Sequence, residues 1–565
     1  MEMEKFVFSS EEIEGGVRAG DYFLKGDFYQ SRGHWFFFKK SLYEIDKSTE
    51  EYFNDYLQDP QTFVTERKGD FALFDYDALN GTIFFASDKL GKENLFFVQG
   101  ERFLVTNSFW EGVSVLKPSE DDIDWLGVKE LIIHYIIPFH KTVIKGYDIV
   151  KPAQTAFVVK ENNRYNIRYN TYWKMEYTPC ESTIPETAEK VYKLFDHTFG
   201  LLAEKYGPDT KFGVGLSGGW DSRLIVYFAK KHDLKLVPYC IGEKYLAFPI
   251  KTNGYKVVNR LAKFFGLDNF KFIPYNKETY LKKVAREVAL TPDMASNIEI
   301  GCLEALPDFD VLLGGIHGGV FFGEFGFEPL LMYKKDNFAD CLLNLLASDE
   351  NQEMIMTEQD KAALKEKTQD YIDSLETDKR FEVYYHYFFD IKASKSKRGF
   401  FESLYGTKER YSMFLDPDFI EEYLTWDPLF LIDRSLQRYF FKKYMPELSK
   451  IPDETTDAPL YWRDSSIQNV PRRFIYGIVN YIFKSSLRRG KWLGRDKDFK
   501  RLVMKVEEVN KELIKRQFPK LEIGQFYHNN PRATANLVKV LMVIDVMLNG
   551  NGDIENYILS RYCCS

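Results

Sequence analysis

The sequence predicts an α/β protein in two parts, a β-rich α+β region over residues 1–178 and a strand–helix region over 179–565. Short aromatic and apolar runs separated by turn signals dominate the first 175 residues or so, which is typical of antiparallel strands. Strand and helix patterns then alternate after about residue 210, which indicates a parallel sheet covered by helices. From about residue 330 onward the pattern is predominantly helical.

Length and composition narrow the possible classes of protein. The chain has 565 residues, so two or three domains are expected, and its net charge of −8 argues against nucleic acid as a partner. No apolar run reaches the roughly 18–20 residues of a membrane-spanning helix, and the acidic N-terminus lacks the apolar segment of a signal peptide. The six cysteines are scattered without a CxxC pair, so we expect a reducing, cytoplasmic location.

The front region contains a hairpin pattern. A strand is predicted from Phe71 to Tyr76, a tight turn at Asn80-Gly81 and a second strand from Thr82 to Ala86. Asn-Gly favours such a turn because both residues tolerate positive φ. We therefore expect the two strands to pair.

A long amphipathic helix is predicted to begin near Glu181. Its apolar residues recur every three or four positions over about five turns, and Gly207-Pro208 ends it. The alternating region follows, with strands predicted at 212–216, 234–239, 270–275 and 310–313 and helices at 255–265 and 278–290. In such a sheet, ligands bind at the carboxyl ends of the strands.

The turn after the first of these strands reads SGGWDS and combines the features of a phosphate site. Gly218 and Gly219 let the backbone approach an anion closely, and the helix that follows from about Ser222 presents free N–H groups and a positive dipole. The hydroxyls of Ser217 and Ser222 are donors for phosphate oxygens. The carboxylate of Asp221 can hold the Mg²⁺ that accompanies ATP.

This turn resembles the SGGxDS pyrophosphate loop of the N-type ATP pyrophosphatases, which cleave ATP between its α- and β-phosphates to form an acyl-adenylate. It is not a Walker loop, because the GxxxxGKS or GxxxxGKT pattern is absent. The resemblance implies ATP and Mg²⁺ as cofactors, bound by Ser217, Gly218, Gly219, Asp221 and Ser222. It also implies that backbone groups around Ile241, after the second strand, hold the adenine.

Part of the front region resembles the class II glutaminase domain of asparagine synthetases. The likeness rests on GDFA from Gly69, SDKLG from Ser87 and LFF from Leu95, and on the stretch from Thr142 to Trp173. It implies an Ntn-hydrolase-like β-rich domain, followed by an adenine nucleotide α-hydrolase-like synthetase domain with a helical C-terminal part.

The front region departs from that family at the nucleophile. A class II glutaminase attacks the glutamine amide with an N-terminal cysteine, exposed once the initiator methionine is removed. Position 2 here is Glu2, and no cysteine occurs before Cys180. A carboxylate cannot replace the activated thiol, so we expect a retained scaffold without glutaminase activity.

A second motif of the family, LSGEGADE, aligns with the segment LGGIHGGVF. The segment keeps a glycine-rich character, and Gly315 is expected to line the ATP site. Ile316 stands in place of the glutamate and Gly319 in place of the aspartate, so the second Mg²⁺ carboxylate has to come from elsewhere. Glu324 is the candidate replacement, with a catalytic role, and His317 is either a phosphate ligand or a structural residue of the loop.

The helical region carries two further likenesses. The segment RYSMFLD from Arg410 resembles the family's RxPFLD segment, and Arg438 to Pro446 resembles the helix that precedes the catalytic lysine of asparagine synthetases. Glu454 occupies the position expected for that lysine. Lys450 is the nearest lysine and the candidate catalytic one.

A basic stretch ends the aromatic and charged segment 474–501. Eight Lys or Arg residues and two Asp residues lie between Lys484 and Arg501. Two interpretations remain open: a peripheral membrane or polyanion contact, or the solvated face of a helix.

The resemblances imply an enzyme that activates a carboxylate with ATP and then joins it to an amine. The first interpretation is a glutamine-independent, amide-forming ligase, similar to β-lactam synthetases and lasso-peptide cyclases. The loop of the cyclases reads SGGxDSR, and Arg223 stands at the position of its arginine. Its substrates would be a small-molecule, peptide or glycan carboxylate and an amine. The second is an asparagine synthetase that uses aspartate and ammonia, and the third is a nucleotide-binding protein without catalysis. The oligomeric state stays open.

Overall fold

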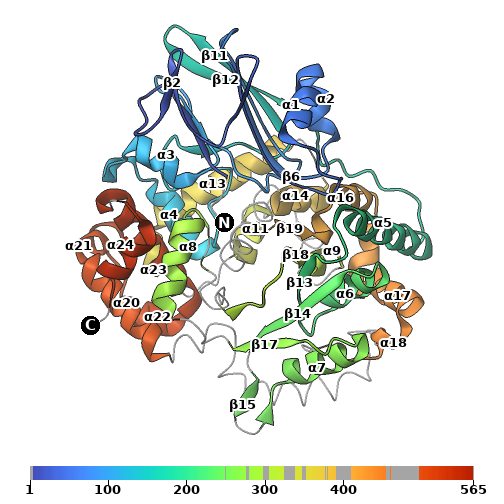
Figure 1. Ribbon diagram of the computed structural model, residues 1–565. Helices are drawn as coiled ribbons and strands as arrows, with labels where there is room; N and C mark the ends of the chain where they lie inside the picture. Colours follow the sequence, from blue (N-terminus) through green and yellow to red (C-terminus); the bar gives the residue numbers. More distant parts are fainter. Residues whose placement is uncertain are drawn as a thin grey trace.

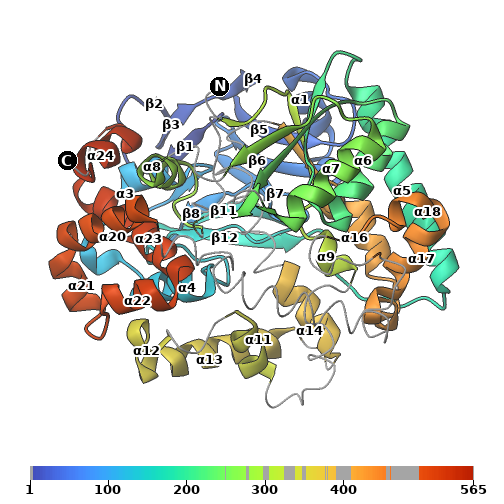
Figure 2. The same ribbon diagram turned by 90° about the horizontal axis from the view of Figure 1, so that it is seen from below.

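The described residues have a mixed α/β architecture with two six-stranded antiparallel sheets, one parallel sheet, a two-stranded antiparallel sheet and many helices (Figures 1 and 2). The computed structural model describes residues 4–242, 244–247, 250–274, 279–294, 296, 305–322, 338–346, 352–375, 377, 379–389, 409–453, 459, 496–550 and 552–563. Glu2, Glu324, Glu454 and residues 474–495 of the segment 474–501 lie outside these ranges.

Two six-stranded antiparallel sheets form the front part. The first has the order β10-β8-β9-β1-β3-β2, with bounds Asp148–Ile149, Phe96–Val98, Leu104–Thr106, Phe6–Ser9, Tyr22–Gly26 and Val17–Ala19. The second has the order β12-β11-β7-β6-β5-β4, with bounds Arg164–Thr171, Gln154–Glu161, Thr82–Ser87, Gly69–Asp77, His34–Leu42 and Tyr29–Ser31. The predicted hairpin is confirmed, because β6 and β7 pair with Tyr76 opposite Ile83.

The two sheets pack face to face over an aromatic interior, and helices cover both outer faces (Figure 1). Phe6 and Phe8 of β1 meet Phe74 of β6 there, with ring centroids 4.9 and 5.0 Å apart. The outer face of the second sheet is covered by α1 (Thr49–Gln58) and α2 (Pro60–Glu66). The outer face of the first is covered by α3 (Phe109–Leu116) and α4 (Trp125–His134). Large flat side chains that alternate along the strands fill this interior.

The predicted amphipathic helix is confirmed as α5 (Ile184–Lys205), although it begins later than Glu181. Thr183 sets its start through a capping box, in which the side chain of Glu186 accepts the N–H of Thr183 at 2.8 Å. One apolar cluster joins the buried face of α5 to the parallel sheet and to Tyr43 and Leu90 of the front part.

A five-stranded sheet of order β17-β14-β13-β18-β19, parallel throughout, forms the second half of the fold. Its strands are Lys271–Pro274, Lys235–Gly242, Lys211–Gly215, Val311–Gly314 and Glu409–Ser412. The four strands predicted here are confirmed. The fifth, β19, overlaps the start of the RYSMFLD segment, for which no strand is predicted. Besides α5, the helices α6 (Trp220–Lys231) and α7 (Asn253–Phe265) pack against one face of the sheet.

The C-terminal region is helical, as predicted. Its core helices α20 (Lys497–Val509), α23 (Pro531–Asn549) and α24 (Ile554–Arg561) pack with α4 and with the predicted helix α8 (Tyr280–Leu290) (Figure 2). Among the described residues no single helix is long and apolar enough to cross a membrane; the pair α23–α24 passes by length and composition, but it is bent by 109°.

The remaining elements connect these layers. They are β15 (Tyr245–Ala247), β16 (Ile250–Lys251), α9 (Gly318–Phe321), α11 (Phe338–Leu346), α12 (Gln352–Ile355), α13 (Glu358–Ser374), α14 (Arg380–His386), α16 (Pro417–Tyr423), α17 (Ser435–Tyr444), α18 (Pro446–Ser449), α21 (Lys511–Gln517) and α22 (Ile523–Asn529).

Candidate functional site

The SGGWDS loop lies at the carboxyl end of β13, the central strand of the parallel sheet (Figure 1). The helix α6 begins at Trp220, earlier than the predicted start near Ser222, with Gly219 as its N-cap residue. Asp221 and Ser222 therefore belong to the first turn of the helix. Gly219 has no side chain that could accept the first backbone N–H groups of α6. These N–H groups can therefore donate to a bound anion.

The two serines of the loop have different environments. Ser222 is buried, and its hydroxyl lies 3.2 Å from the carbonyl oxygens of both Ser217 and Gly219, which share its single proton as acceptors. Ser217 is exposed, and its Oγ accepts the N–H of Gly219 at 3.1 Å. Ser217 is thus the hydroxyl that a ligand can reach, whereas Ser222 maintains the shape of the loop.

Arg223 ties the loop to a distant segment. Its side chain is 0% exposed, and the guanidinium donates to the carbonyl oxygen of Gly218 at 2.9 Å. It also donates to the carbonyl oxygens of Ile451 and Pro452 at 2.7 and 2.6 Å. The guanidinium carbon lies 3.9 Å from the centroid of the Trp220 ring, which adds a cation–π contact. Arg223 is therefore a positioning residue, a role that its place in the SGGxDSR pattern did not reveal.

The second glycine loop, residues 315–318, lies directly against Asp221. A Cβ atom on Gly318 would be 2.3 Å from Cγ of Asp221 and 2.6 Å from its Oδ1. A Cβ atom on Gly315 would be 3.0 Å from Cδ1 of Ile225 and 3.5 Å from Cβ of Asp221. Any side chain on Gly318 would displace the carboxylate. The fold thereby brings together Gly315 and Asp221, which we predicted for one site.

His317 occupies the turn of this second loop. Its φ of 69° lies in the left-handed region, which few residues other than glycine adopt. The imidazole packs edge-on against Phe388, with ring centroids 5.1 Å apart and planes at 87°. This contact agrees with a structural role for the ring.

Ile241 lies inside β14 and not after it, because β14 continues along β17 to Gly242. The carbonyl of Tyr239 accepts the N–H of Leu216 at 2.7 Å, on the side of β13. Backbone groups of successive strand residues point to alternate sides, so those of Ile241 point to the same side as those of Tyr239. Since β13 ends at Gly215, the N–H and C=O of Ile241 extend past the end of that strand. This placement suits recognition of an adenine edge.

Lys450 stands at the end of α18, in the segment whose carbonyls bind Arg223. Its side chain is 60% exposed, and Nζ donates to Oε1 of Glu447 at 2.5 Å. The structure thus places the backbone of this segment beside the loop and the lysine amine at the surface. Glu324, the other predicted catalytic residue, is outside the described residues.

Asp221 provides one carboxylate for a metal ion. Within the described part of the chain, no group of three or more His, Cys, Asp or Glu residues is placed to hold a metal. A Mg²⁺ ion that arrives with a nucleotide needs less, because one or two protein carboxylates complete its shell of phosphate oxygens and water. The donor set at Asp221 therefore fits a nucleotide-borne Mg²⁺.

The SDKLG motif of the front part forms a closed turn. Asp88 is fully buried, and its carboxylate accepts the N–H groups of Leu90, Lys92 and Glu93 at 2.9, 2.9 and 3.0 Å. Burial raises the pKa of Asp88 to about 6, and the neighbouring Asp70 adds to this rise. The N–H of Phe71 also donates to this carboxylate, at 3.4 Å, and a carboxylate that accepts four backbone N–H groups has a structural role.

Two loops thus meet at the carboxyl ends of the neighbouring strands β13 and β18, and Asp221 lies between them. Comparison of the sequence with protein-family models and with curated proteins gives no match. The function is therefore inferred from the geometry of these two loops and from the SGGxDS resemblance.

Proposed function

We propose that this protein is an ATP-dependent, amide-forming ligase that adenylates a carboxylate and releases AMP and pyrophosphate. The observation that carries the proposal is the meeting of the SGGWDS loop and the 315–318 loop at Asp221. This meeting point lies at the carboxyl ends of parallel strands, where open α/β sheets bind their ligands. Two glycine-rich loops around one carboxylate suit a phosphate chain that carries a metal ion.

In the proposed first step, an oxygen of the substrate carboxylate attacks the α-phosphorus of ATP. The bond between the α-phosphorus and the bridging oxygen breaks, and pyrophosphate leaves with the developing negative charge. The hydroxyl of Ser217 and the N–H groups of the first turn of α6 donate to its oxygens, from positions fixed before the reaction. Mg²⁺ held by Asp221 would neutralise part of this charge. Arg223 binds the carbonyl of Gly218 and so keeps the loop in place.

In the proposed second step, the amine nitrogen attacks the acyl carbon, AMP leaves, and the nitrogen loses a proton. Lys450 and Glu324 remain our candidates for groups that assist these steps. The backbone of Ile241 is the candidate adenine contact. The acid is a small-molecule, peptide or glycan carboxylate; with aspartate as the acid and ammonia as the amine, the protein would be an asparagine synthetase.

A nucleotide-binding protein without catalysis is the second candidate. One observation favours it: Gly319 stands where the family motif has a carboxylate. Such a protein would bind ATP and leave it intact.

Exchange of radiolabelled pyrophosphate into ATP, measured with a panel of carboxylic acids, separates the two candidates. A ligase shows exchange with at least one acid, and Asp221→Ala lowers the rate by about a thousandfold. Asp209→Ala is the matched control, because Asp209 is fully exposed and lies 3.5 Å from Lys235 in a surface ion pair. ATP binding without exchange for any acid would favour the second candidate.

The front part is proposed to lack glutaminase activity because of Glu2. Release of glutamate from glutamine by the purified protein would contradict this. Mass spectrometry of the products formed from ATP, the carboxylic acid and ammonia shows whether an amide forms without glutamine.

A further inference from the structure

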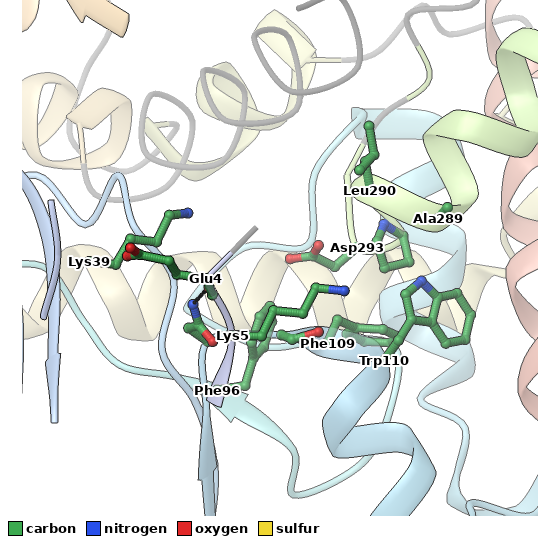
Figure 3. A pocket seen from close by; sticks show the side chains of 12 residues that line it. Glu4, Lys5, Lys39, Phe96, Phe109, Trp110, Ala289, Leu290 and Asp293 are labelled. Carbon is green, nitrogen blue, oxygen red and sulfur yellow. Dashed lines mark hydrogen bonds between the residues drawn. The ribbon is translucent and has the colours of Figure 1, made fainter. Parts of the chain in front are cut away.

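A seam of contacts joins the front part to the rest of the chain, and the proposed mechanism gives these contacts no role. Figure 3 shows a cavity in this seam, lined by Lys5 and Lys39 of the front part and by Asp293 after α8. The cavity has room for about one water molecule, so it does not take up a substrate. The role of the seam therefore has to come from what its contacts hold in place.

The seam reaches the candidate site at β19, the edge strand of the parallel sheet. Tyr43 directly follows β5, and its hydroxyl donates to the carbonyl oxygen of Ser412 at 3.1 Å. The rings of Tyr43 and Tyr411 lie 5.0 Å apart, and both residues are buried. The Tyr411 hydroxyl divides its proton between the carbonyl of Leu42 at 2.9 Å and the carboxylate of Glu409 at 2.7 Å. These contacts attach the end of β19 to the front part.

The residues at the end of β19 and just after it lie against both ends of the second glycine loop. Ser412 lies opposite Gly314 in the parallel pairing of β18 and β19, one residue before that loop begins. At the other end, a Cβ atom on Gly318 would be 2.6 Å from Cε2 of Phe414 and 2.3 Å from Cγ of Asp221. The edge of the Phe414 ring and the carboxylate of Asp221 therefore meet at Gly318 from two sides.

Phe414 is fully buried, and other aromatic rings surround it. Its ring centroid lies 5.4, 6.3 and 5.8 Å from those of Phe195, Phe321 and Phe419. The edge of an aromatic ring carries partial positive charge, so its place beside a carboxylate is favourable. A ring in a close-packed interior cannot shift without displacing its neighbours. A displacement of the segment after β19 is therefore passed on to Asp221.

Two charged contacts from the front part hold the ends of the same segment. Arg410, in β19, donates to Oε1 of Glu93 at 3.3 Å. Lys92 donates to the carbonyl of Leu415 at 3.0 Å and also pairs with the buried Asp70, which fixes its ammonium group. The tyrosine contact lies between these two, at the turn where the strand ends.

We propose that the front part supports the candidate site and that Tyr43 is a positioning residue through which it does so. The Tyr43 hydroxyl fixes Ser412, which lies beside the start of the second glycine loop, and Phe414 fixes the carboxylate of Asp221 at the end of that loop. A front part without a nucleophilic cysteine thereby has a role in the geometry of the other half. The proposed function gives this geometry its catalytic meaning, whereas the coupling itself is a property of the ligand-free protein.

Hydrogen–deuterium exchange of the full-length, ligand-free protein, followed by mass spectrometry, tests the coupling. Tyr43→Phe removes only the hydroxyl, and we expect amides in peptides that cover residues 409–416 to deuterate about fivefold faster. The same rise is expected in peptides that cover 311–322 and 216–225, which carry the two loops of the candidate site. A rise confined to 409–416, or no rise in any of the three regions, would overturn the proposal.

Tyr172→Phe is the matched control. The hydroxyl of Tyr172 donates to the carbonyl of Ser87 at 2.8 Å, so this change also removes one bond from a tyrosine to a backbone carbonyl, but within the front part. Peptides that cover the two loops should deuterate at the wild-type rate in this variant. Equal acceleration in both variants would show a general loosening of the fold and would overturn the role of Tyr43.

Pyrophosphate exchange measures the consequence for the proposed function, on which this second test rests. We expect Phe414→Leu and Tyr43→Phe to raise the Mg²⁺ concentration for half-maximal exchange by about fivefold and about twofold, because Asp221 is less well placed. If both residues only stabilised the fold, folded molecules would keep the wild-type Mg²⁺ dependence, and that result would overturn the assigned role. Absence of exchange in the wild type would contradict the proposed function itself, and the deuterium measurement would still decide the coupling.

Discussion

Two aspartates of this protein stand in motifs that resemble the same enzyme family, yet the fold treats them differently. Asp88, in SDKLG, is fully buried, and four backbone N–H groups donate to its carboxylate. Asp221, in SGGWDS, is partly exposed at a helix start, and a second loop approaches it with glycines. The first motif closes a turn, whereas the second presents a carboxylate at the end of a parallel sheet.

The difference shows that a sequence motif can be present because it stabilises the fold or because it forms a binding site. In the front part, the resemblance persists around a buried turn although the nucleophilic cysteine is absent. In the second half, the resemblance coincides with the place where a parallel sheet binds ligands. Variants at the two aspartates and at their supports should therefore affect different properties.

The largest expected effect is that of replacing Arg223, because this residue both stabilises the fold and positions the SGGWDS loop. Arg223→Met removes a buried guanidinium that binds the carbonyls of Gly218, Ile451 and Pro452. We expect a loss of about 3–5 kcal/mol in the free energy of unfolding and loss of pyrophosphate exchange. Urea denaturation and the exchange assay measure the two effects. Exchange at the wild-type rate in Arg223→Met would show that the loop does not need this support.

Asp88→Ala should reduce stability alone. The change leaves the N–H groups of Leu90, Lys92 and Glu93 without their buried acceptor, which costs about 2–4 kcal/mol. Exchange per folded molecule, measured well below the melting temperature, should equal that of the wild type. A specific loss of exchange in a fully folded sample would contradict the structural role of this turn.

Gly318→Ala should mainly lower exchange. Its Cβ atom would overlap the carboxylate of Asp221 and lie 2.6 Å from Cε2 of the buried Phe414 ring, so both groups must move. The shift of the carboxylate can lower the rate about a hundredfold, and the shift of the ring also lowers stability. Gly207→Ala is the matched control, because a Cβ atom there has no atom within 4 Å. If both variants exchange at the same rate, the close approach of the two loops has no bearing on catalysis.

The smallest effect on stability is expected for Lys450. Its exposed ion pair with Glu447 contributes about 0–1 kcal/mol, so Lys450→Ala should unfold at the wild-type temperature. If Lys450 stabilises a transition state, exchange in the variant falls at least about tenfold. Lys442→Ala, at an exposed lysine of α17, controls for the loss of one surface charge. Equal rates in all three proteins would remove Lys450 from the catalytic set.

Much of the fold could be predicted because its signals are local. The hairpin of β6 and β7, the apolar face of α5 and the alternation from β13 to β18 all follow from side-chain period and turn residues. Element ends were less certain, because caps decide them: Thr183 delays α5 and Gly219 starts α6 early. The strand β19 could not be predicted, because a strand of four residues at a sheet edge is too short to show a hydrophobic period in the sequence.

The candidate site was predictable only in part, for the same reason. The residues Ser217 to Ser222 were identified because one short segment carries all their chemistry. The role of Arg223 was not, because its acceptors at Leu448 and Ile451 lie 225 and 228 residues away in the chain. The position of Lys450 relative to the loop likewise depends on how α18 packs.

The sequence by itself determined the α/β class, the order of the strands in the chain and the SGGWDS loop, since period, glycine and capping act over a few residues. Only the tertiary structure decided that Gly318 backs onto Asp221, that Arg223 joins two segments, and that Tyr43 of the front part contacts Ser412 at the end of β19. These contacts form where segments that are distant in the sequence pack together. Each residue's burial and electrostatic environment there depend on neighbours that the local sequence does not specify.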